Sequence, residues 1–263
     1  MKISHVAAQL YTLRDYIKTP ADIASTLKKV RAIGYEAVQV SGMGPIDEAE
    51  LNRILAGEGL ICCATHEDGN KILNQTELVI ERLQKLNCHY TAYPWPAGVD
   101  FSTLQNVLDL AAKLDAAGKK MRKAGQVLTY HNHAMELSVI DGKTALDWIY
   151  EKSNKKNLQG EIDTFWIQNG GADPVAWCKK LKKRLPLIHL KDYTVIDNKP
   201  SFAAVGHGNL NMPAIVQAAE KAGCEWFIVE QDDCYGRDPF ENLALSFNYL
   251  KGLAAQDVAG VAP

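Results

Sequence analysis

The sequence lacks the features that define several large classes of proteins. No apolar run reaches the roughly 20 residues that a transmembrane helix needs. The six cysteines show no Cys-x-x-Cys spacing, and most lie in apolar runs, as reduced thiols that pack like small hydrophobic residues do. The first residues enter a strand directly, without the apolar core and cleavage site of a signal peptide. We therefore expect a cytoplasmic protein with no membrane association.

The sequence also lacks a large excess of charge of either sign. The net charge is -2, and the basic residues are scattered, with the densest cluster at 179–184 typical of the solvated face of a helix. A nucleic-acid binder normally carries a long basic track, so we expect no nucleic-acid partner. The apolar fraction of 47% and the charged fraction of 23% are ordinary for a globular protein with a large core, which excludes a disordered or fibrous class.

Apolar runs and breakers alternate regularly along the chain and predict eight strand–helix units. The expected strands are Ile3–Leu10, Ala37–Val40, Leu60–Ala64, His89–Tyr93, Gln126–His133, Leu158–Asp163, Pro186–Lys191 and Glu225–Glu230. The expected helices are Pro20–Ala32, Asp47–Ala56, Ile72–Leu86, Ser102–Lys123, Lys143–Lys152, Asp173–Lys183, Met212–Ala222 and Pro239–Leu253.

Eight such units of about 30 residues each are what a closed (β/α)₈ TIM barrel requires. We expect one barrel domain over residues 1–253 and a disordered tail over 254–263. A doubly wound sheet is the alternative, but no strand is followed by the Gly-x-Gly-x-x-Gly turn of dinucleotide-binding proteins. The nearest approach, around Gly206 and Gly208, follows a polar loop.

Four of the predicted strands end in polar residues. His131 and His133 are two apart, so a strand places them on one face. Three later apolar runs close on Asp163, His189 and Glu230. A single buried histidine is usually a hydrogen-bonded core residue, but four such strand ends at the carboxyl edge of a parallel barrel predict a metal site.

Several short motifs together resemble the xylose isomerase-like superfamily of sugar isomerases and epimerases, over about residues 3–252. They are Gln9–Asp15, Tyr130–Glu136, Glu161–Asp163, His189–Asp192 and Val229–Asp232. The superfamily includes ketose 3-epimerases, hydroxypyruvate isomerases, inosose dehydratases, 3-keto-sugar lyases and, more distantly, endonuclease IV.

The resemblance implies a divalent metal held by a Glu, Asp, His, Glu set at the carboxyl end of the barrel. It places Asp163, His189 and Glu230 at three of these positions. The fifth strand departs from the epimerases because it ends in histidines, so we assign Glu136 as the fourth ligand, with His131 or His133 as substitutes. Carboxylates and imidazole without thiolates suit Mn²⁺, Mg²⁺, Co²⁺ or Zn²⁺.

Sugar isomerisation also needs a base, and His133 is the first candidate. Glu161, Glu230 or His131 are the alternatives, and Lys191, which shares the face of His189, either binds a developing oxyanion or projects from the barrel rim. By resemblance, four residues shape the sugar pocket, although plain packing would also explain them: Gln9, Arg14, His66 and Trp95. His207 departs from the family, which often has Glu there.

These residues predict a metal-dependent isomerase or epimerase that abstracts a proton next to the carbonyl of a small sugar or keto-sugar, through an enediolate. The alternative is a lyase or dehydratase on a keto-sugar, keto-glycoside or keto-inositol, because elimination begins with the same step. Endonuclease-like hydrolysis would need more histidine ligands and a basic groove, and a broken metal site would leave a non-catalytic sugar-binding barrel. A homo-oligomer is compatible with the sequence.

Overall fold

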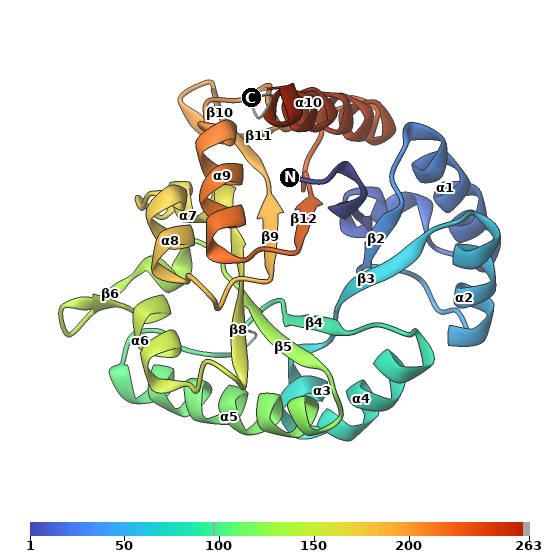
Figure 1. Ribbon diagram of the computed structural model, residues 1–263. Helices are drawn as coiled ribbons and strands as arrows, with labels where there is room; N and C mark the ends of the chain where they lie inside the picture. Colours follow the sequence, from blue (N-terminus) through green and yellow to red (C-terminus); the bar gives the residue numbers. More distant parts are fainter. Residues whose placement is uncertain (97, 260–263) are drawn as a thin grey trace.

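Eight short runs of mostly buried residues form parallel strands that close into a barrel (Figure 1). The computed structural model describes residues 1–96 and 98–259. In spatial order the barrel strands are β1 (Val6–Gln9), β12 (Trp226–Val229), β9 (Leu187–Leu190), β8 (Leu158–Asp163), β5 (Val127–His131), β4 (Tyr90–Tyr93), β3 (Ile61–His66) and β2 (Ala37–Val40). The fold is the predicted (β/α)₈ TIM barrel.

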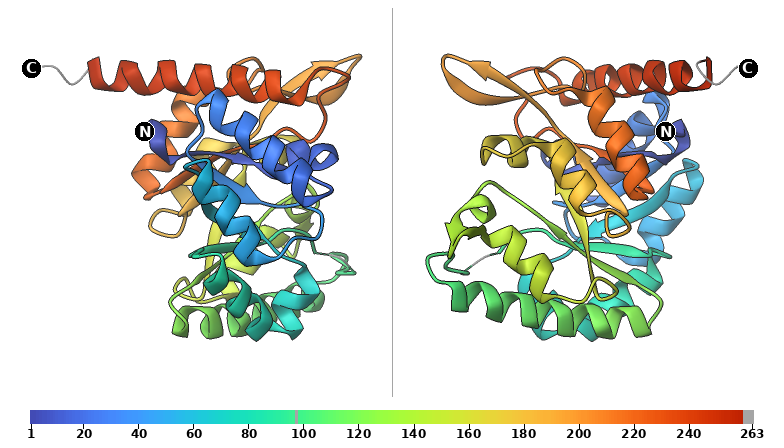
Figure 2. Two further views of the ribbon diagram at one scale, coloured as in Figure 1. Left: turned by 90° about the vertical axis from the view of Figure 1, so that its right-hand side faces the viewer. Right: turned by 60° about the vertical axis from the view of Figure 1, so that its left-hand side comes forward.

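Helices surround this barrel (Figures 1 and 2). Their bounds are α1 Pro20–Ile33, α2 Glu48–Gly57, α3 Gly69–Asn74, α4 Thr76–Lys85, α5 Leu104–Lys123, α6 Ala145–Lys152, α7 Thr164–Asn169, α8 Pro174–Lys180, α9 Met212–Ala222 and α10 Pro239–Ala259. Capping residues mark where helices begin: Thr19 and Asp22 form a capping box for α1, and Asp47 caps α2. None of the described helices is both long and apolar enough to cross a membrane.

The structure adds elements that the sequence pattern did not show. The expected first strand begins and ends as 3₁₀ turns, η1 (Ile3–His5) and η2 (Leu10–Tyr16). The expected third helix divides into α3 and α4 at Gln75, whose backbone is not helical. Two antiparallel hairpins follow barrel strands: β6 (Val139–Ile140) with β7 (Lys143–Thr144), and β10 (Asp192–Ile196) with β11 (Lys199–Ala203). A short 3₁₀ turn, η3 (Met135–Leu137), follows β5.

The second hairpin turns through Asp197 and Asn198, both with positive φ, a backbone conformation that Asp and Asn adopt more readily than most residues. At the end of the chain, α10 is a long helix along one edge of the molecule (Figure 2) and contains residues 254–259 of the expected tail. The remaining tail residues, 260–263, lie outside the described residues.

Candidate active site and metal centre

Polar side chains from the strands meet at the carboxyl end of the barrel, above an apolar layer. Because strand residues alternate between two faces, each polar residue shares a face with the residue two positions before it. The apolar and polar pairs are Ala7 and Gln9, Ala37 and Gln39, Leu187 and His189, and Ile228 and Glu230. The strand register then places His131 beside Glu161 and Asp163 beside His189.

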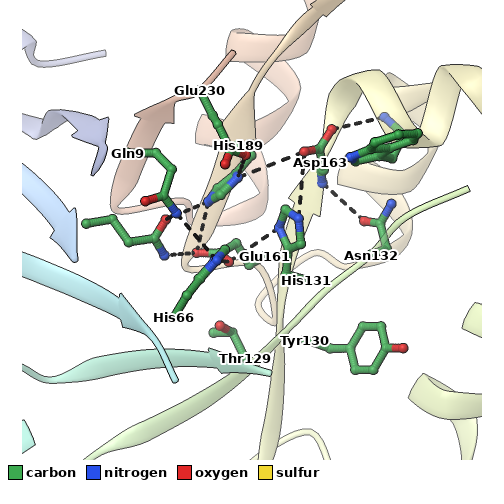
Figure 3. Close-up of polar contacts among 12 residues, drawn as sticks. Gln9, His66, Thr129, Tyr130, His131, Asn132, Glu161, Asp163, His189 and Glu230 are labelled. Carbon is green, nitrogen blue, oxygen red and sulfur yellow. Dashed lines mark hydrogen bonds and ion pairs between the residues drawn. The ribbon is translucent and has the colours of Figure 1, made fainter. Parts of the chain in front are cut away.

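Four of these side chains form a buried donor group, defined by His131, Asp163, His189 and Glu230 (Figure 3). One ligand atom of each residue lies within 4.8 Å of the others. Asp163 Oδ2 is 3.8 Å from His131 Nε2 and 3.9 Å from His189 Nδ1. Glu230 Oε2 is 2.9 Å from His189 Nδ1. The donor group therefore has the dimensions of a shared coordination site.

Asp163 is held in place by the start of α7. Its Oδ1 accepts a hydrogen bond from the backbone N–H of Trp166 at 3.0 Å and so caps that helix. Its own backbone N–H donates to Asn132 Oδ1 at 3.1 Å. The second carboxylate oxygen, Oδ2, is buried and accepts no well-aligned hydrogen bond, although a lysine ammonium lies close to it. One carboxylate oxygen thus caps α7, and the other faces the ligand atoms of the other donor-group residues.

An inner polar layer supports the donor group from below. Glu161 is fully buried, accepts a hydrogen bond from Gln39 Nε2 at 2.6 Å, and is bonded to His66 Nε2 at 2.7 Å. Gln39 Oε1 is 2.7 Å from His189 Nε2 and also accepts from Gln9 Nε2 at 2.6 Å. An amide oxygen only accepts, so Gln39 keeps a proton on Nε2 of His189 and leaves Nδ1 of the neutral ring free to bind a cation.

Burial and opposite charge compete throughout this cluster. Burial alone would lower the pKa of His189, but Glu161 and Glu230 raise it to about 10. Burial would raise the pKa of Glu161, yet His189 and His66 hold it well below its usual value. For His131 burial prevails and, with the charge on His189, lowers the pKa well below its ordinary range. The protein alone therefore carries a charged His189 beside a neutral His131.

Lys191, directly after β9, places its ammonium against the same carboxylates. Its Nζ lies 2.7 Å from Glu230 Oε2 and 3.0 Å from Asp163 Oδ2. Both oxygens of Asp232 lie within hydrogen-bond distance, at 3.0 and 3.1 Å. Burial would lower the pKa of Lys191, but the three carboxylates raise it above its ordinary value. At 1% exposure the side chain is a buried cation and does not project from the rim.

A cavity of about 700 Å³ opens onto these groups. Three of the four predicted pocket residues line it: Arg14, His66 and Trp95. The fourth, Gln9, is fully buried beneath the cavity and acts through its hydrogen bond to Gln39. Glu161 is also fully buried and does not line the cavity, so its geometry suits support of the histidines better than contact with a substrate.

His133 lies two residues beyond the end of β5 and lines the cavity. Its ring packs against two tryptophans, with centroid distances of 4.7 Å to Trp95 and 5.4 Å to Trp166. The ring centroid of His131 is 5.0 Å away. Burial, with a smaller effect from the charge of Lys191, lowers the pKa of His133 to about 3. The imidazole is therefore unprotonated at neutral pH.

The structure places Glu136 apart from the donor group. Its Oε1 accepts from the hydroxyl of Tyr130 at 3.0 Å, and its Oε2 accepts from the backbone N–H of His133 at 2.9 Å. The described residues form two groups of candidate ligands, the donor group and a second group of His66, His131, Glu161 and His189. Glu136 belongs to neither. His131 is instead the fourth member of the donor group, with Asp163, His189 and Glu230. The reason is chain direction: η3 turns Glu136 back onto β5, whereas His131 ends the strand inside the barrel.

Two imidazoles and two carboxylates suit a divalent cation such as Mn²⁺, Mg²⁺, Co²⁺ or Zn²⁺. Oδ1 of Asp163 is held by the N–H of Trp166 while Oδ2 faces the other ligand atoms, and Gln39 orients His189, so hydrogen bonds from surrounding groups fix both ligands. The residues present therefore fit a metal centre.

Sequence reasoning missed Gln39, Trp166 and the role of Asp232. Gln39 is a polar residue inside an otherwise apolar strand, which is an unusual place for an amide and is a usable signal. Asp232 belongs to a motif noted in the sequence, but nothing there pairs it with Lys191. Trp166 follows Asp163 by three residues, and only the turn into α7 brings it against His133.

Comparisons with known proteins agree with this architecture. The chain matches the family model described as xylose isomerase-like TIM barrel over residues 27–253, and no curated protein matches it significantly. A sugar phosphate isomerase/epimerase from Parabacteroides distasonis has a similar structure, with a TM-score of 0.81 at 20% identity over 95% of this chain and 94% of the other.

Two further solved structures share the fold at lower identity. One is an L-ribulose 3-epimerase, with a TM-score of 0.72 at 13% identity over 98% of each chain. The other is a xylose isomerase-like TIM barrel protein from Mycobacterium smegmatis in complex with magnesium, with a TM-score of 0.74 at 14% identity over 96% of this chain and 98% of the other. At such identities the likeness concerns the fold, while the family match covers most of the sequence: this chain belongs to the xylose isomerase-like TIM barrel family.

Proposed function

We propose that this protein is a divalent-metal-dependent isomerase or epimerase of a small sugar or keto-sugar. The observation that carries the proposal is the buried donor group at the floor of a cavity, with the neutral His133 lining the same cavity. The fold also occurs in proteins described as a sugar phosphate isomerase/epimerase and an L-ribulose 3-epimerase. Fold alone does not determine chemistry, so the site supports the proposal more strongly than the likeness does.

The reaction would begin with removal of a proton from the carbon next to a carbonyl. A divalent cation bound by the donor group would supply Lewis-acid polarisation of that carbonyl. His133 is the base in this proposal, because it lines the cavity and its imidazole is unprotonated at neutral pH. The buried charge of Lys191 lies beside the donor group and stabilises negative charge on the resulting enediolate. A proton delivered to the opposite face of the same carbon from another group or from solvent completes epimerisation, and a proton delivered to the neighbouring carbon completes isomerisation.

Elimination is the second candidate, since it starts from the same enediolate and then needs an acid for the departing oxygen. His66 favours it, because this histidine lines the cavity and is hydrogen-bonded to the carboxylate of Glu161. A probable 3-DHS dehydratase from Bacillus anthracis shares the fold, with a TM-score of 0.70 at 14% identity. In this version His133 removes the proton and His66 donates one to the leaving group.

The reaction is proposed to take place in the cytoplasm on a small molecule, without a nucleic-acid partner. The six cysteines are all free thiols, which supports a reducing compartment. The near-neutral charge supports the absence of a nucleic-acid partner.

Proton NMR in D₂O tests the proposal directly. The protein loaded with Mg²⁺ would be incubated with a panel of ketoses and 3-keto-sugars, with and without phosphate. Solvent deuterium at one carbon reports proton abstraction, and the product then separates an epimer or isomer from an eliminated alkene. The protein treated with a chelator is the control. Exchange that persists after chelation, or no exchange with any member of the panel, would contradict the proposal.

A further inference from the structure

Lys191 contacts the same two oxygen atoms that the donor group offers to a cation. Its Nζ lies 3.0 Å from Asp163 Oδ2 and 2.7 Å from Glu230 Oε2. Those oxygens also lie 3.9 and 2.9 Å from Nδ1 of His189. A divalent cation held by Asp163 and Glu230 would therefore lie within a few ångströms of a buried ammonium group, and the two positive charges would repel each other strongly in such a setting.

Asp232 gives this ammonium a second place to bind. Its two carboxylate oxygens lie 3.1 and 3.0 Å from Nζ, and Asp232 itself lines the cavity. Asp232 is not a member of either candidate ligand group among the described residues. The lysine thus bridges a pair of ligand carboxylates and one carboxylate that is free to hold it alone.

We propose that Lys191 is an internal counter-ion that competes with the divalent cation for Asp163 and Glu230, and that Asp232 receives its ammonium when the cation binds. The inference rests on the metal centre of the proposed function and adds a determinant of its affinity. Two opposite effects follow, because Lys191 weakens cation binding by its charge while Asp232 strengthens it by drawing that charge away.

Direct binding of Mn²⁺ measures the effect without reference to activity. Free Mn²⁺ is titrated by its electron paramagnetic resonance signal in wild type, Lys191→Met and Asp232→Asn. We expect Lys191→Met to bind Mn²⁺ about 10-fold more tightly or better, since it removes a buried positive charge near the cation. Asp232→Asn should bind more weakly, because the lysine is then left with the ligand carboxylates alone.

Matched controls separate this role from a general structural one. Lys143→Met removes an exposed lysine that is also paired with a carboxylate, Glu151, and should leave Mn²⁺ affinity unchanged. Where Lys191→Met does not fold, Lys191→Gln removes the charge and keeps a hydrogen-bond donor. In the double variant of Lys191→Met and Asp232→Asn, the loss caused by Asp232→Asn should shrink, because the charge that Asp232 holds is gone.

Equal or weaker Mn²⁺ binding by both neutral variants at position 191 would overturn the inference, as would the absence of Mn²⁺ binding in every protein. The deuterium-exchange assay distinguishes this from failure of the proposed function. Tighter binding in Lys191→Met without exchange in any sugar would retain the inference and reject the function. Metal-dependent exchange with unchanged Mn²⁺ affinity in that variant would retain the proposed function and reject the inference.

Discussion

The two halves of the barrel bring different chemistry to the same end of the molecule. Strands β5, β8, β9 and β12 lead to the ionisable donor group (Figure 3), whereas β1 and β2 contribute the amides Gln9 and Gln39. The donor group needs charges to hold a cation. The amides Gln9 and Gln39 orient these groups without adding charge, whereas Glu161 of β8 is the charged member of the supporting layer.

Gln39 shows why an amide suits the supporting half. Its Nε2 donates to Glu161, and its Oε1 accepts from His189 and from Gln9. A carboxylate at this position would repel Glu161, and an ammonium would repel the charged His189. Only a group that both donates and accepts satisfies the two neighbours together. The barrel thus has a binding half, strands β5, β8, β9 and β12, which carries the donor group, and an orienting half, which carries Gln9 and Gln39.

The largest effect is expected in the binding half, at Asp163. Asp163→Ala should abolish both metal binding and turnover, because it removes a ligand oxygen, and it should also shorten α7 by removing its cap. Elemental analysis and the exchange assay measure the first two effects, and circular dichroism the third. Asp163→Asn is the matched variant, since it keeps a capping oxygen and removes the charge. Normal metal content in Asp163→Ala would remove Asp163 from the donor group.

His133 should show a large loss of rate without loss of metal. His133→Ala is expected to lower turnover by about 10²–10⁴, the usual cost of removing a positioned base. Metal content should stay that of the wild type because His133 is outside the donor group. His207→Ala, at an exposed histidine, is the control. Near-normal deuterium exchange in His133→Ala would point to another base, and loss of metal would make His133 a ligand.

Glu136 should make stability depend on pH. Burial raises its pKa from 4.5 to about 7, so the folded state holds the proton more tightly and stability falls as pH rises through that window. Glu136→Gln cannot ionise and should escape this loss, which is on the order of 3 kcal/mol. Urea denaturation of both proteins at about pH 4 and about pH 8 measures the difference. Identical pH dependence of the two proteins would contradict the expectation.

The smallest of the four effects is expected in the orienting half, at Gln39. Gln39→Leu leaves the ligands in place but removes the partner of His189 Nε2, so metal affinity or activity should fall by about 10–100-fold. Mn²⁺ titration measures the change, with Gln84→Leu at an exposed position as control. A loss as complete as that of Asp163→Ala would erase the distinction between the two halves.

The sequence by itself determined the barrel and the location of its site. Apolar runs separated by helices at regular spacing leave few alternatives to a closed parallel barrel, and parallel strands must all end at the same side. Polar residues at those ends, such as Asp163, His189 and Glu230, must therefore lie at the same end of the barrel. These inferences need only local pattern and chain direction, which the order of residues contains.

Tertiary structure decided which side chains meet and in what state. Whether His131 or Glu136 completes the donor group depends on how η3 turns after β5, and the pattern of residues does not specify that turn. The charge of His189 and the contact of Lys191 with three carboxylates arise between strands far apart in sequence. Such effects depend on distance and burial in three dimensions, because electrostatic interactions are set by separation in space and by the exclusion of water.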